Sequence, residues 1–508
     1  MEIPKITTEV RMPKLDFQTD KTKVDVRYSL ISPYANAHIF WDKKLGELVY
    51  ELEEPVLNSE DKENFRKLHD AIQEIINISV ARDETRESME EYLDKIAKLV
   101  ISETQINISE GSYYKLFYYL YRDFYGLNEI EGLMHDYFLE DIQCNGVGQP
   151  IYLVHRVFRN LRTSIEFADV EKLASFVEKL AQKCGKYISY ASPLLDGSLP
   201  DGSRVNATYT KDITSRGPTF TIRKFTKTPF TPLDLLSMGT LSPEMLAFLW
   251  IMVQYKLNIL IAGGTGSGKT TLLNAVAFFI PPEARVVSIE DTRELNLSRE
   301  NWLPSVVRAG MSVGGVGEVD MFTLLRASFR QIPDYVIVGE VRGKEASVLF
   351  QGMASGHASM GTIHADSVET VIRRLETPPI ELSPTLVNEL DAVVVMAHAL
   401  VKGKETRKLR EIIEVVNVTA EGTSTTNTPF VWDPAKDKFY FKKESQVFEK
   451  IQKRNGVSVT ALQEDFNKRV KLLYALYNKK VFDFEMLQRV INEFYKNPSE
   501  VYKKYGIN

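Results

Sequence analysis

The chain has 508 residues, of which 44% are hydrophobic and 26% are charged. This length exceeds one ordinary domain, and the composition is that of a folded globular protein rather than a disordered one. With 63 basic and 68 acidic residues the net charge is −5, which argues against a histone-like coat for nucleic acid. The only two cysteines, Cys144 and Cys184, exclude a disulfide framework and a thiolate-rich metal site.

Neither an export signal nor a membrane span is predicted. Residues 1–14 carry charges and prolines where a signal peptide needs an unbroken apolar stretch. The best apolar run, from Ala392 to Val401, has about half of the roughly 20 residues that a spanning helix requires. We therefore expect a cytoplasmic protein, and a peripheral position at the inner face of the cell membrane stays open to it.

The first part of the chain is predicted to hold two regions. Residues 1–55 mix prolines with short β-like runs, and a helical pattern then extends to about Tyr125. We therefore expect an N-terminal arm and helical bundle over residues 1–130. Residues 131–225 combine strand-like runs with one helix near Ala168–Lys183, which predicts an α+β module.

A proline-containing linker is predicted at residues 226–235, in the segment TKTPFTPLD. Over residues 236–420 apolar strands alternate with helices, which is typical of a mainly parallel sheet with helices on its faces. Residues 421–508 are expected to form a hairpin around Asp433-Pro434 and then helices. The predicted fold class is therefore α/β for the second half of the chain.

The strongest motif is a phosphate-binding loop (P-loop) between an expected strand, NILIA, and an expected helix, TLLNAVAFF. The residues assigned to nucleotide binding are Gly263, Gly264, Thr265, Gly266, Ser267, Gly268, Lys269, Thr270 and Thr271, of which the first eight fit G-x-x-x-x-G-K-[ST]. The glycines let backbone N–H groups turn toward phosphate oxygens. Lys269 would neutralise the β- and γ-phosphates, and the Thr270 hydroxyl would ligate Mg²⁺. The chain is thereby predicted to bind ATP or GTP.

Two acidic strand ends follow the P-loop. The strand YVIVGE ends in Glu340, which can orient the attacking water or hold Mg²⁺ through a water, and Gly339 stands where an Asp is usual. The stretch VVSIEDTREL places Glu290 and Asp291 at the end of another strand. The carboxylates of these two strand ends would converge on the metal and water side of one site. Ordinary solvated acids are the alternative interpretation at both strand ends.

Two further stretches suggest functional segments. Residues 310–320, GMSVGGVGEVD, are predicted to form a mobile loop. In GHASMGTIHADS, His357 and His364 are seven positions apart, too far for the i,i+4 pairing of a zinc helix. His364 follows the strand-like GTI and could contact the γ-phosphate as a hydrogen-bond donor. A satisfied core histidine is the alternative.

In this order and spacing, GGTGSGKT, SIEDTREL, IVGEVRG and GHASMGTIHADS resemble the secretion and type IV pilus assembly ATPase superfamily. FLEDIQCNG and DGSRVNATY resemble its archaeal branch, which includes the archaellum motor ATPase and archaeal pilus assembly ATPases. The resemblance covers about Leu139 to Val418. It implies a RecA-like P-loop NTPase core that follows an α+β module and an N-terminal helical bundle. One departure is Ile332, where the family often has Arg, so no charge role is expected there.

The resemblance also implies roles for individual residues. Arginines from the N-terminal module reach the phosphates in the family, and the matching positions are Arg204, Arg216 and Arg223. The remaining matches are Glu290 with the acid of the family's Asp box, Glu340 with its second acidic strand, and His357 and His364 with its histidine box. These assignments make Glu340, Glu290, His364 and the three arginines catalytic, His357 nucleotide-binding, and Thr270 and Glu340 the metal ligands.

The resulting hypothesis is Mg²⁺-dependent ATP hydrolysis by a homohexameric ring that powers assembly of an archaeal type IV pilus-like filament. By resemblance, the archaellum motor ATPase is the first candidate. The expected partners are a polytopic membrane platform protein and accessory cytoplasmic motor proteins. An adhesive-pilus or secretion ATPase is the alternative, and a DNA translocase is a further one. The negative net charge and the lack of a long basic run count against the latter, so no nucleic-acid partner is expected.

Overall fold

A computed structural model of the protein describes residues 5–8, 15, 20–75, 86–225, 228–308, 317–401, 403–419, 424–442 and 444–507. The chain divides into two compact units, Met1–Phe225 and Thr226–Asn508, which we call unit 1 and unit 2. Each unit has its own hydrophobic core. The division falls at the start of the predicted linker, whose later residues enter a short helix capped by Thr231.

In the described residues, unit 1 contains one sheet of nine strands in the order β1-β2-β3-β6-β5-β4-β9-β8-β7. Its strands are β1 (Asp25–Ile31), β2 (Ala35–Asp42), β3 (Glu47–Glu53), β4 (Leu139–Cys144), β5 (Pro150–His155), β6 (Arg159–Glu166), β7 (Leu194–Ser198), β8 (Arg204–Thr208) and β9 (Thr219–Arg223). Its α-helices are α1 (Ser59–Ile75), α2 (Arg86–Thr104), α3 (Glu110–Leu120), α4 (Glu131–Met134) and α5 (Val170–Lys183). β3 and β6 pair in parallel, and all other neighbours in this sheet pair antiparallel.

The residues predicted as an N-terminal arm supply the first three strands of this sheet. The pairing of β3 with β6 joins Tyr50 to Thr163, across the boundary predicted at residue 130. The fully buried carboxylate of Asp136 adds a second connection, because it accepts hydrogen bonds of 2.7 Å from the hydroxyls of both Tyr28 and Tyr50. A buried carboxylate is tolerated only with such partners. The regions predicted as 1–130 and 131–225 therefore share one sheet and one core.

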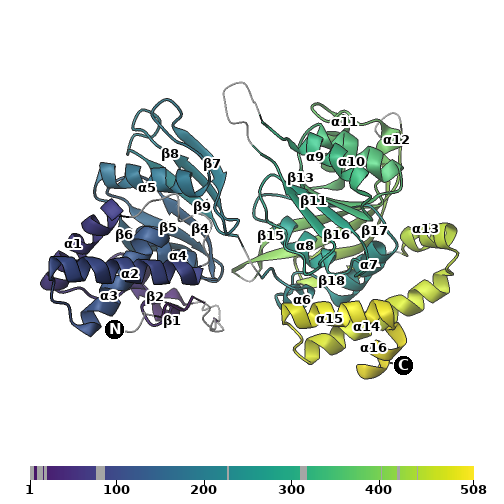
Figure 1. The fold of residues 1–508 in the computed structure, drawn as a ribbon. Helices are drawn as coiled ribbons and strands as arrows, with labels where there is room; N and C mark the ends of the chain where they lie inside the picture. The colour runs from purple at the N-terminus through teal and green to yellow at the C-terminus, as the bar shows by residue number, and fades with distance from the viewer. Residues whose placement is uncertain are drawn as a thin grey trace. The chain divides into compact units, whose positions relative to one another are not determined.

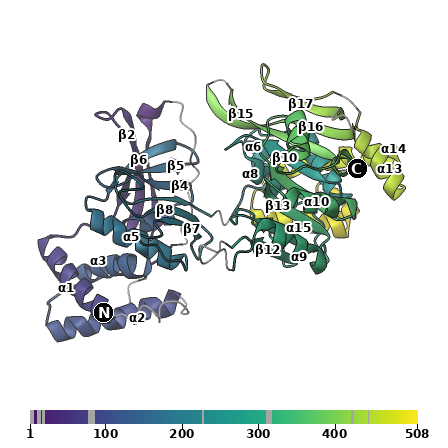
Figure 2. The same ribbon diagram turned by 90° about the horizontal axis from the view of Figure 1, so that it is seen from above.

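The helices α1, α2 and α3 contact one another, and Figure 2 shows them grouped beside the strands of unit 1. Leu68 and Ile72 of α1 are fully buried four residues apart, as expected for one apolar stripe of a helix. The α3 helix begins at Ser109, whose side chain accepts the N–H of Ser112. It buries Tyr113, Phe117 and its neighbours in the same core as the sheet.

In the described residues, unit 2 also contains a sheet of nine strands, in the order β12-β11-β13-β14-β10-β15-β16-β17-β18. Its strands are β10 (Ile259–Gly263), β11 (Val286–Glu290), β12 (Trp302–Val306), β13 (Tyr335–Val341), β14 (Ala358–Ile363), β15 (Ala392–Val401), β16 (Lys404–Val418), β17 (Ser424–Asp433) and β18 (Lys438–Phe441). Its α-helices are α6 (Pro232–Ser237), α7 (Pro243–Gln254), α8 (Lys269–Ala277), α9 (Met321–Ser328), α10 (Glu345–Ala354), α11 (Val368–Glu376), α12 (Pro384–Val387), α13 (Gln446–Asn455), α14 (Val459–Asn478), α15 (Phe484–Lys496) and α16 (Pro498–Lys504).

The strands from β12 to β15 in this order run parallel, and β15 to β18 pair antiparallel. Both faces of the parallel part are covered, so its strands are apolar without alternation. Ile259 and Ile261 of β10 point into a core shared with α7, α8 and the C-terminal helices, whereas Leu260 and Ala262 point into a core shared with α9, α10 and α11. Figure 1 shows these two groups of helices on opposite sides of the sheet.

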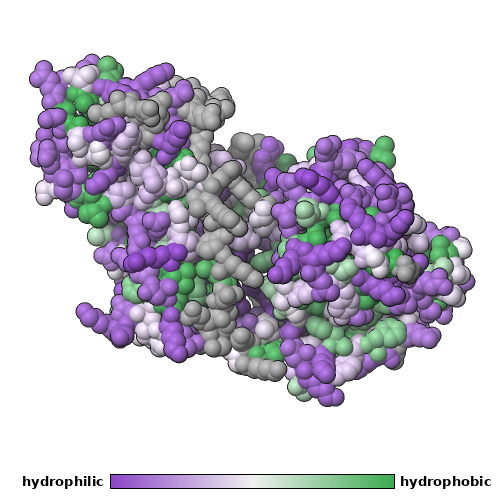
Figure 3. Space-filling model, turned by 90° about the horizontal axis from the view of Figure 1, so that it is seen from below, coloured by the Kyte–Doolittle hydropathy of each residue, from purple (hydrophilic) through white to green (hydrophobic). Residues whose placement is uncertain are grey.

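The described part of the chain includes no helix that is both long enough and apolar enough to span a bilayer. The apolar run from Ala392 to Val401 forms strand β15. On the face drawn in Figure 3 hydrophilic residues predominate and hydrophobic residues occur in small groups. Most of the loop predicted at residues 310–320 lies outside the described residues.

Candidate nucleotide-binding site

The P-loop lies at the carboxyl-terminal edge of the parallel strands of unit 2. Strand β10 ends at Gly263, and helix α8 begins at Lys269. Because parallel strands share one polarity, the ends of β11 and β13 reach the same edge and bring Glu290 and Glu340 there. This edge is where open α/β sheets bind their ligands.

Two glycines of the loop stand where another residue would be strained. A Cβ on Gly263 would lie 2.4 Å from the Ser267 Oγ and 2.8 Å from the Met396 carbonyl oxygen. Gly268 has a φ of 92°, a conformation that favours glycine. The hydroxyl of Ser267 donates to the Gly264 carbonyl at 2.8 Å and closes the turn.

Side chains from three segments hold three consecutive residues of the loop. The Lys269 Nζ donates to the Gly264 carbonyl at 2.9 Å. Thr265 Oγ1 and His364 Nε2 share a hydrogen bond of 3.0 Å. The third contact comes from strand β16, where Arg407 Nε donates to the Gly266 carbonyl at 2.8 Å. The loop is therefore fixed from several sides.

Glu340 lies beside the P-loop lysine as part of an ion-pair network. Its Oε2 accepts a hydrogen bond of 2.7 Å from Arg342, which also donates to Asp291 at 3.2 Å. Partial burial raises the pKa of Glu340, but the hydrogen bond and charge of Arg342, together with Lys269 and His364, hold this pKa below its ordinary value. Glu340 is therefore ionised at neutral pH.

Glu290 has the opposite electrostatic character. It is 1% exposed, and its Oε1 accepts the backbone N–H groups of Glu294 and Leu295 at 2.9 Å each. Burial outweighs these hydrogen bonds and raises the pKa of Glu290 to about 7. Within the described residues its Oε2 has no hydrogen-bond partner, although it is buried. A carboxyl group of this kind can take up a proton near neutral pH.

Gly339, which replaces the usual Asp, makes room for Glu290. A Cβ at this position would lie 3.1 Å from the Glu290 Cγ and 3.4 Å from its Cβ. An Asp side chain would therefore press against the buried acid. The space that an Asp side chain would need is thus occupied by Glu290 of the neighbouring strand.

The oxygen donors at this edge fit a hard divalent cation. Thr270 and Thr271 lie in the first turn of α8, partly exposed, and the carboxylates of Glu340 and Glu290 belong to the adjacent strand ends. Mg²⁺ prefers hydroxyl, carboxylate and phosphate oxygens. The Oε2 of Glu290 has no partner among the described residues, which agrees with the binding of Mg²⁺ or of a water molecule on it at this edge.

His357 lies at the other edge of the sheet. It precedes β14, whose six residues separate it from His364, and a strand of this length spans about 20 Å. Its ring lies 4.9 Å from that of Phe329, and it lines a cavity of about 560 Å³ together with Lys256 and Arg454. The structure thus brings His364 to the P-loop of its own chain but does not bring His357 there, which corrects the predicted nucleotide contact of His357 within one chain.

Residues 131–469 match the family described as Type II/IV secretion system protein. The chain belongs to this family. With its P-loop on a RecA-like α/β core it is a secretion ATPase, as the sequence predicts. It is 32% identical to an uncharacterized protein of Methanocaldococcus jannaschii, over 97% of this chain and 94% of the relative. It is also 34% identical to the conjugal transfer protein TrbB of Rhizobium radiobacter, over 44% of this chain and 68% of the relative.

Two solved structures are similar to this secretion ATPase. The ATPase DotB of Legionella pneumophila is 16% identical, with 70% of this chain and 92% of that chain covered and a TM-score of 0.39. The pilus retraction motor PilT with bound ADP is 17% identical, with 67% and 90% covered and a TM-score of 0.39.

The predicted arginines of the secretion ATPase lie in unit 1. Arg204 of β8 and Arg223 of β9 are register partners, and two such like charges side by side need counterions. Arg204 pairs with Asp196 at 2.9 Å, and Arg223 pairs with Asp141 at 3.1 Å. Arg216 is exposed in the segment that leads to β9. Their contact with phosphates stays a prediction.

Two residues at the ATPase site, Arg342 and Arg407, are not among those that the sequence motifs predict. Arg342 follows Glu340 by two positions inside the quoted motif IVGEVRG, and its charge was the available signal. Arg407 comes from the basic run KETRKLR, 141 residues after the loop residue that it contacts. No local pattern links these two segments, because their contact depends on the pairing of β10, β15 and β16.

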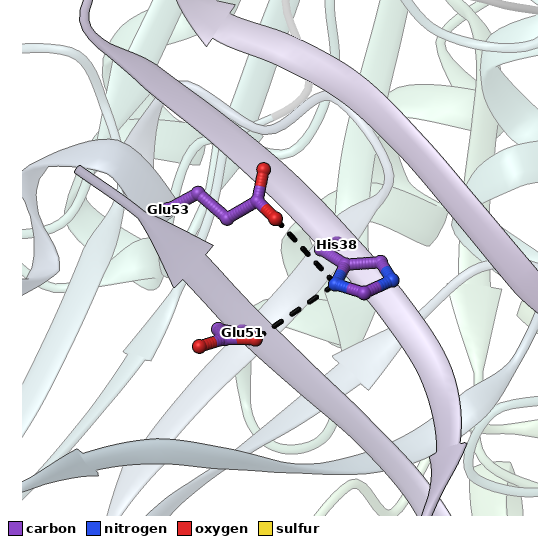
Figure 4. Close-up of side chains that lie close together, drawn as sticks. All are labelled: His38, Glu51 and Glu53. Atoms are coloured by element: carbon purple, nitrogen blue, oxygen red, sulfur yellow. Dashed lines mark ion pairs between the residues drawn. The ribbon is translucent and has the colours of Figure 1, made fainter. Parts of the chain in front are cut away.

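A second cluster of titratable side chains lies on β1, β2 and β3, far along the chain from the P-loop. His38 Nδ1 is 3.5 Å from Glu53 Oε1 and 3.8 Å from Glu51 Oε2. Figure 4 shows the two glutamates on the same side of the His38 ring. His38 Nε2 lies 2.9 Å from Asp25 Oδ1. Arg27 already provides a positive charge here, because it pairs with Glu53 at 3.1 Å and lies 3.4 Å from His38 Nδ1. We assign no metal ion to this cluster.

Proposed function

We propose that this secretion ATPase hydrolyses Mg²⁺-ATP as a homohexameric ring and powers the assembly of an archaeal type IV pilus-like filament, with the archaellum as the first candidate. One observation carries the hydrolytic part of the proposal. A P-loop lysine shares one sheet edge with a buried carboxyl group whose pKa is raised to about 7, Glu290, and with an ion-paired carboxylate, Glu340. This is the combination that phosphoryl transfer to water requires.

The P-loop would bind the phosphates of ATP. Its backbone N–H groups and the amino-terminal end of α8 offer hydrogen-bond donors and a positive dipole end. Lys269 would exchange the Gly264 carbonyl for the β- and γ-phosphates. Thr270 and Glu340 would hold Mg²⁺, which supplies charge neutralisation at the phosphate oxygens when it is bound.

Glu290 and Glu340 would have different tasks. Glu290 would accept the proton of the attacking water at its unpartnered Oε2, because its raised pKa makes it a usable base near neutral pH. Glu340 would stay ionised and orient the water and the cation, because Arg342 holds it in place. His364 would contact the γ-phosphate, since it already holds Thr265 of the loop.

The ring and the filament rest on family membership and on the resemblance. In such a ring Arg204, Arg216 and Arg223 would supply positive charge at the γ-phosphate, and domain closure would then be coupled to hydrolysis. We propose a cytoplasmic position at the inner face of the membrane, under a polytopic platform protein and beside accessory motor proteins. The match to conjugal transfer proteins supports an alternative, a transfer or secretion ATPase.

Lys269→Ala in the full chain tests the proposal. Purified wild-type protein is expected to release phosphate from Mg²⁺-ATP, and the variant is expected to bind ATP poorly and release little. In cells of the source organism, loss of swimming and of the swimming filament with intact adhesive pili would support the archaellum assignment. Loss of pili with normal swimming would make the protein a pilus assembly ATPase. Salt-sensitive stimulation of turnover by DNA would favour transfer instead.

A further inference from the structure

The hairpin of β15 and β16 extends past the P-loop. Strand β15 pairs with β10 only up to the register pair Gly263 and Met396. Beyond Met396, β15 continues to Val401 in antiparallel pairing with β16. This distal part of the hairpin therefore stands beside the loop that leads from β10 into α8.

Two side chains of the hairpin lie directly against P-loop glycines. A Cβ on Gly268 would be 3.4 Å from the Arg407 Cδ and 3.6 Å from the Met396 Cε. A Cβ on Gly263 would be 2.8 Å from the Met396 carbonyl oxygen. Gly263 is therefore needed for the approach of the hairpin backbone, whereas Arg407 and Met396 lie at van der Waals distance from Gly268.

The hydrogen bond of Arg407 sets the orientation of one peptide plane in the loop. Arg407 Nε donates to the Gly266 carbonyl at 2.8 Å. In a trans peptide the carbonyl and the following N–H point in opposite directions. A donor that holds the Gly266 carbonyl toward the hairpin therefore turns the N–H of Ser267 away from the hairpin, where it donates to the Gly264 carbonyl at 3.4 Å, the same carbonyl that accepts from Lys269. Inward N–H groups are what a P-loop offers to phosphate.

We propose that Arg407 is a positioning residue for the nucleotide: it fixes the peptide between Gly266 and Ser267 for phosphate binding and connects the β15–β16 hairpin to the P-loop. This inference rests on the proposed function of the P-loop. In this role Arg407 acts through the loop backbone, because its Nε donates to the Gly266 carbonyl. Its loss would therefore weaken nucleotide binding more than it slows the chemical step.

The test compares Arg407→Ala, Arg407→Lys and Arg407→Gln with Arg489→Ala in the full chain. Arg489 is an exposed arginine of α15 that pairs with Glu485 at 3.2 Å, so its variant controls for the loss of one surface charge. The measurements are the Kd of a fluorescent ATP analogue with Mg²⁺, KM and kcat for ATP, and the melting temperature. The lysine and glutamine variants keep a donor and separate binding from folding if the alanine variant unfolds early.

We expect Arg407→Ala to raise Kd and KM about tenfold, which corresponds to the loss of one hydrogen bond from a charged donor. We expect kcat to change far less, Arg407→Lys to recover part of the affinity, and Arg489→Ala to behave as wild type. An Arg407→Ala protein with wild-type Kd and KM would refute the role of Arg407 alone. A wild-type protein that neither binds nor hydrolyses ATP would instead refute the proposed function.

Discussion

Two buried polar side chains, Asn258 and Glu290, lie at opposite edges of the unit 2 sheet and differ in whether their hydrogen bonds are made. At the amino-terminal edge, the Asn258 side chain accepts the N–H of Ser359 at 3.0 Å and donates to the Glu389 carbonyl at 2.9 Å. At the carboxyl-terminal edge, Glu290 keeps one buried oxygen without a partner among the described residues. A polar group whose bonds are all made stabilises strand pairing, whereas an unfilled one is available to a ligand or a proton.

The largest effect, a loss of turnover, is expected at Glu290, whose Oε2 has no partner among the described residues. Glu290→Gln should retain ATP binding but lower kcat by about 10²- to 10⁴-fold, the usual contribution of a general base. Glu340→Gln should also bind ATP and turn it over slowly, because the cation and water lose an ionised partner. Glu485→Gln, at the exposed acid of α15 that pairs with Arg489, is the control. Steady-state phosphate release measures all three, and wild-type turnover by Glu290→Gln would remove it from the role of base.

At Asn258, whose side chain bonds two neighbouring segments, the expected loss is in stability. Asn258→Ala would leave the N–H of Ser359 and the carbonyl of Glu389 without their buried partners. We expect the free energy of unfolding to fall by about 2–4 kcal/mol, with KM for ATP unchanged in the folded protein. Urea unfolding of both proteins measures the difference. A variant of normal stability but raised KM would mean that the two edges are not separable in this way.

The raised pKa of Glu290 also predicts a dependence of stability on pH. Between the ordinary glutamate pKa of 4.5 and the folded value of about 7, the unfolded chain has lost this proton while the folded chain keeps it. The free energy of unfolding should therefore fall as pH rises through this window, on the order of 3 kcal/mol for this one group. Glu290→Gln lacks the group, so its stability should fall less.

Urea unfolding of nucleotide-free wild type and Glu290→Gln at pH 5, 6, 7 and 8 tests this expectation. The difference between the two stability curves should change across the window and level off above pH 7. Two parallel curves would show that the folded Glu290 titrates like an unfolded glutamate. The proton-accepting role would then lose its electrostatic basis.

The sequence alone predicted the elements that local rules determine. The P-loop, with Lys269, and the acidic strand ends at Glu290 and Glu340 follow from short motifs and from strand polarity. Tertiary contacts decide the rest. The pKa of Glu290 depends on burial and on the space beside Gly339, and the place of Arg407 depends on strand pairing between segments 141 residues apart.

The two histidines of GHASMGTIHADS allow the two sheet edges to be compared within one motif. The motif treats them alike, yet the six residues of β14 between them place His364 on the P-loop and His357 at the opposite edge. His364→Ala should raise KM or lower kcat about tenfold, since Thr265 loses its hydrogen bond and the phosphate loses a donor. His357→Ala should leave the kinetics of an isolated chain unchanged, because its ring packs on Phe329. If His357→Ala lowers turnover only under conditions where the chain assembles, then the amino-terminal edge acts on the site of a neighbouring copy. The two sheet edges would then have separate roles only within a single chain.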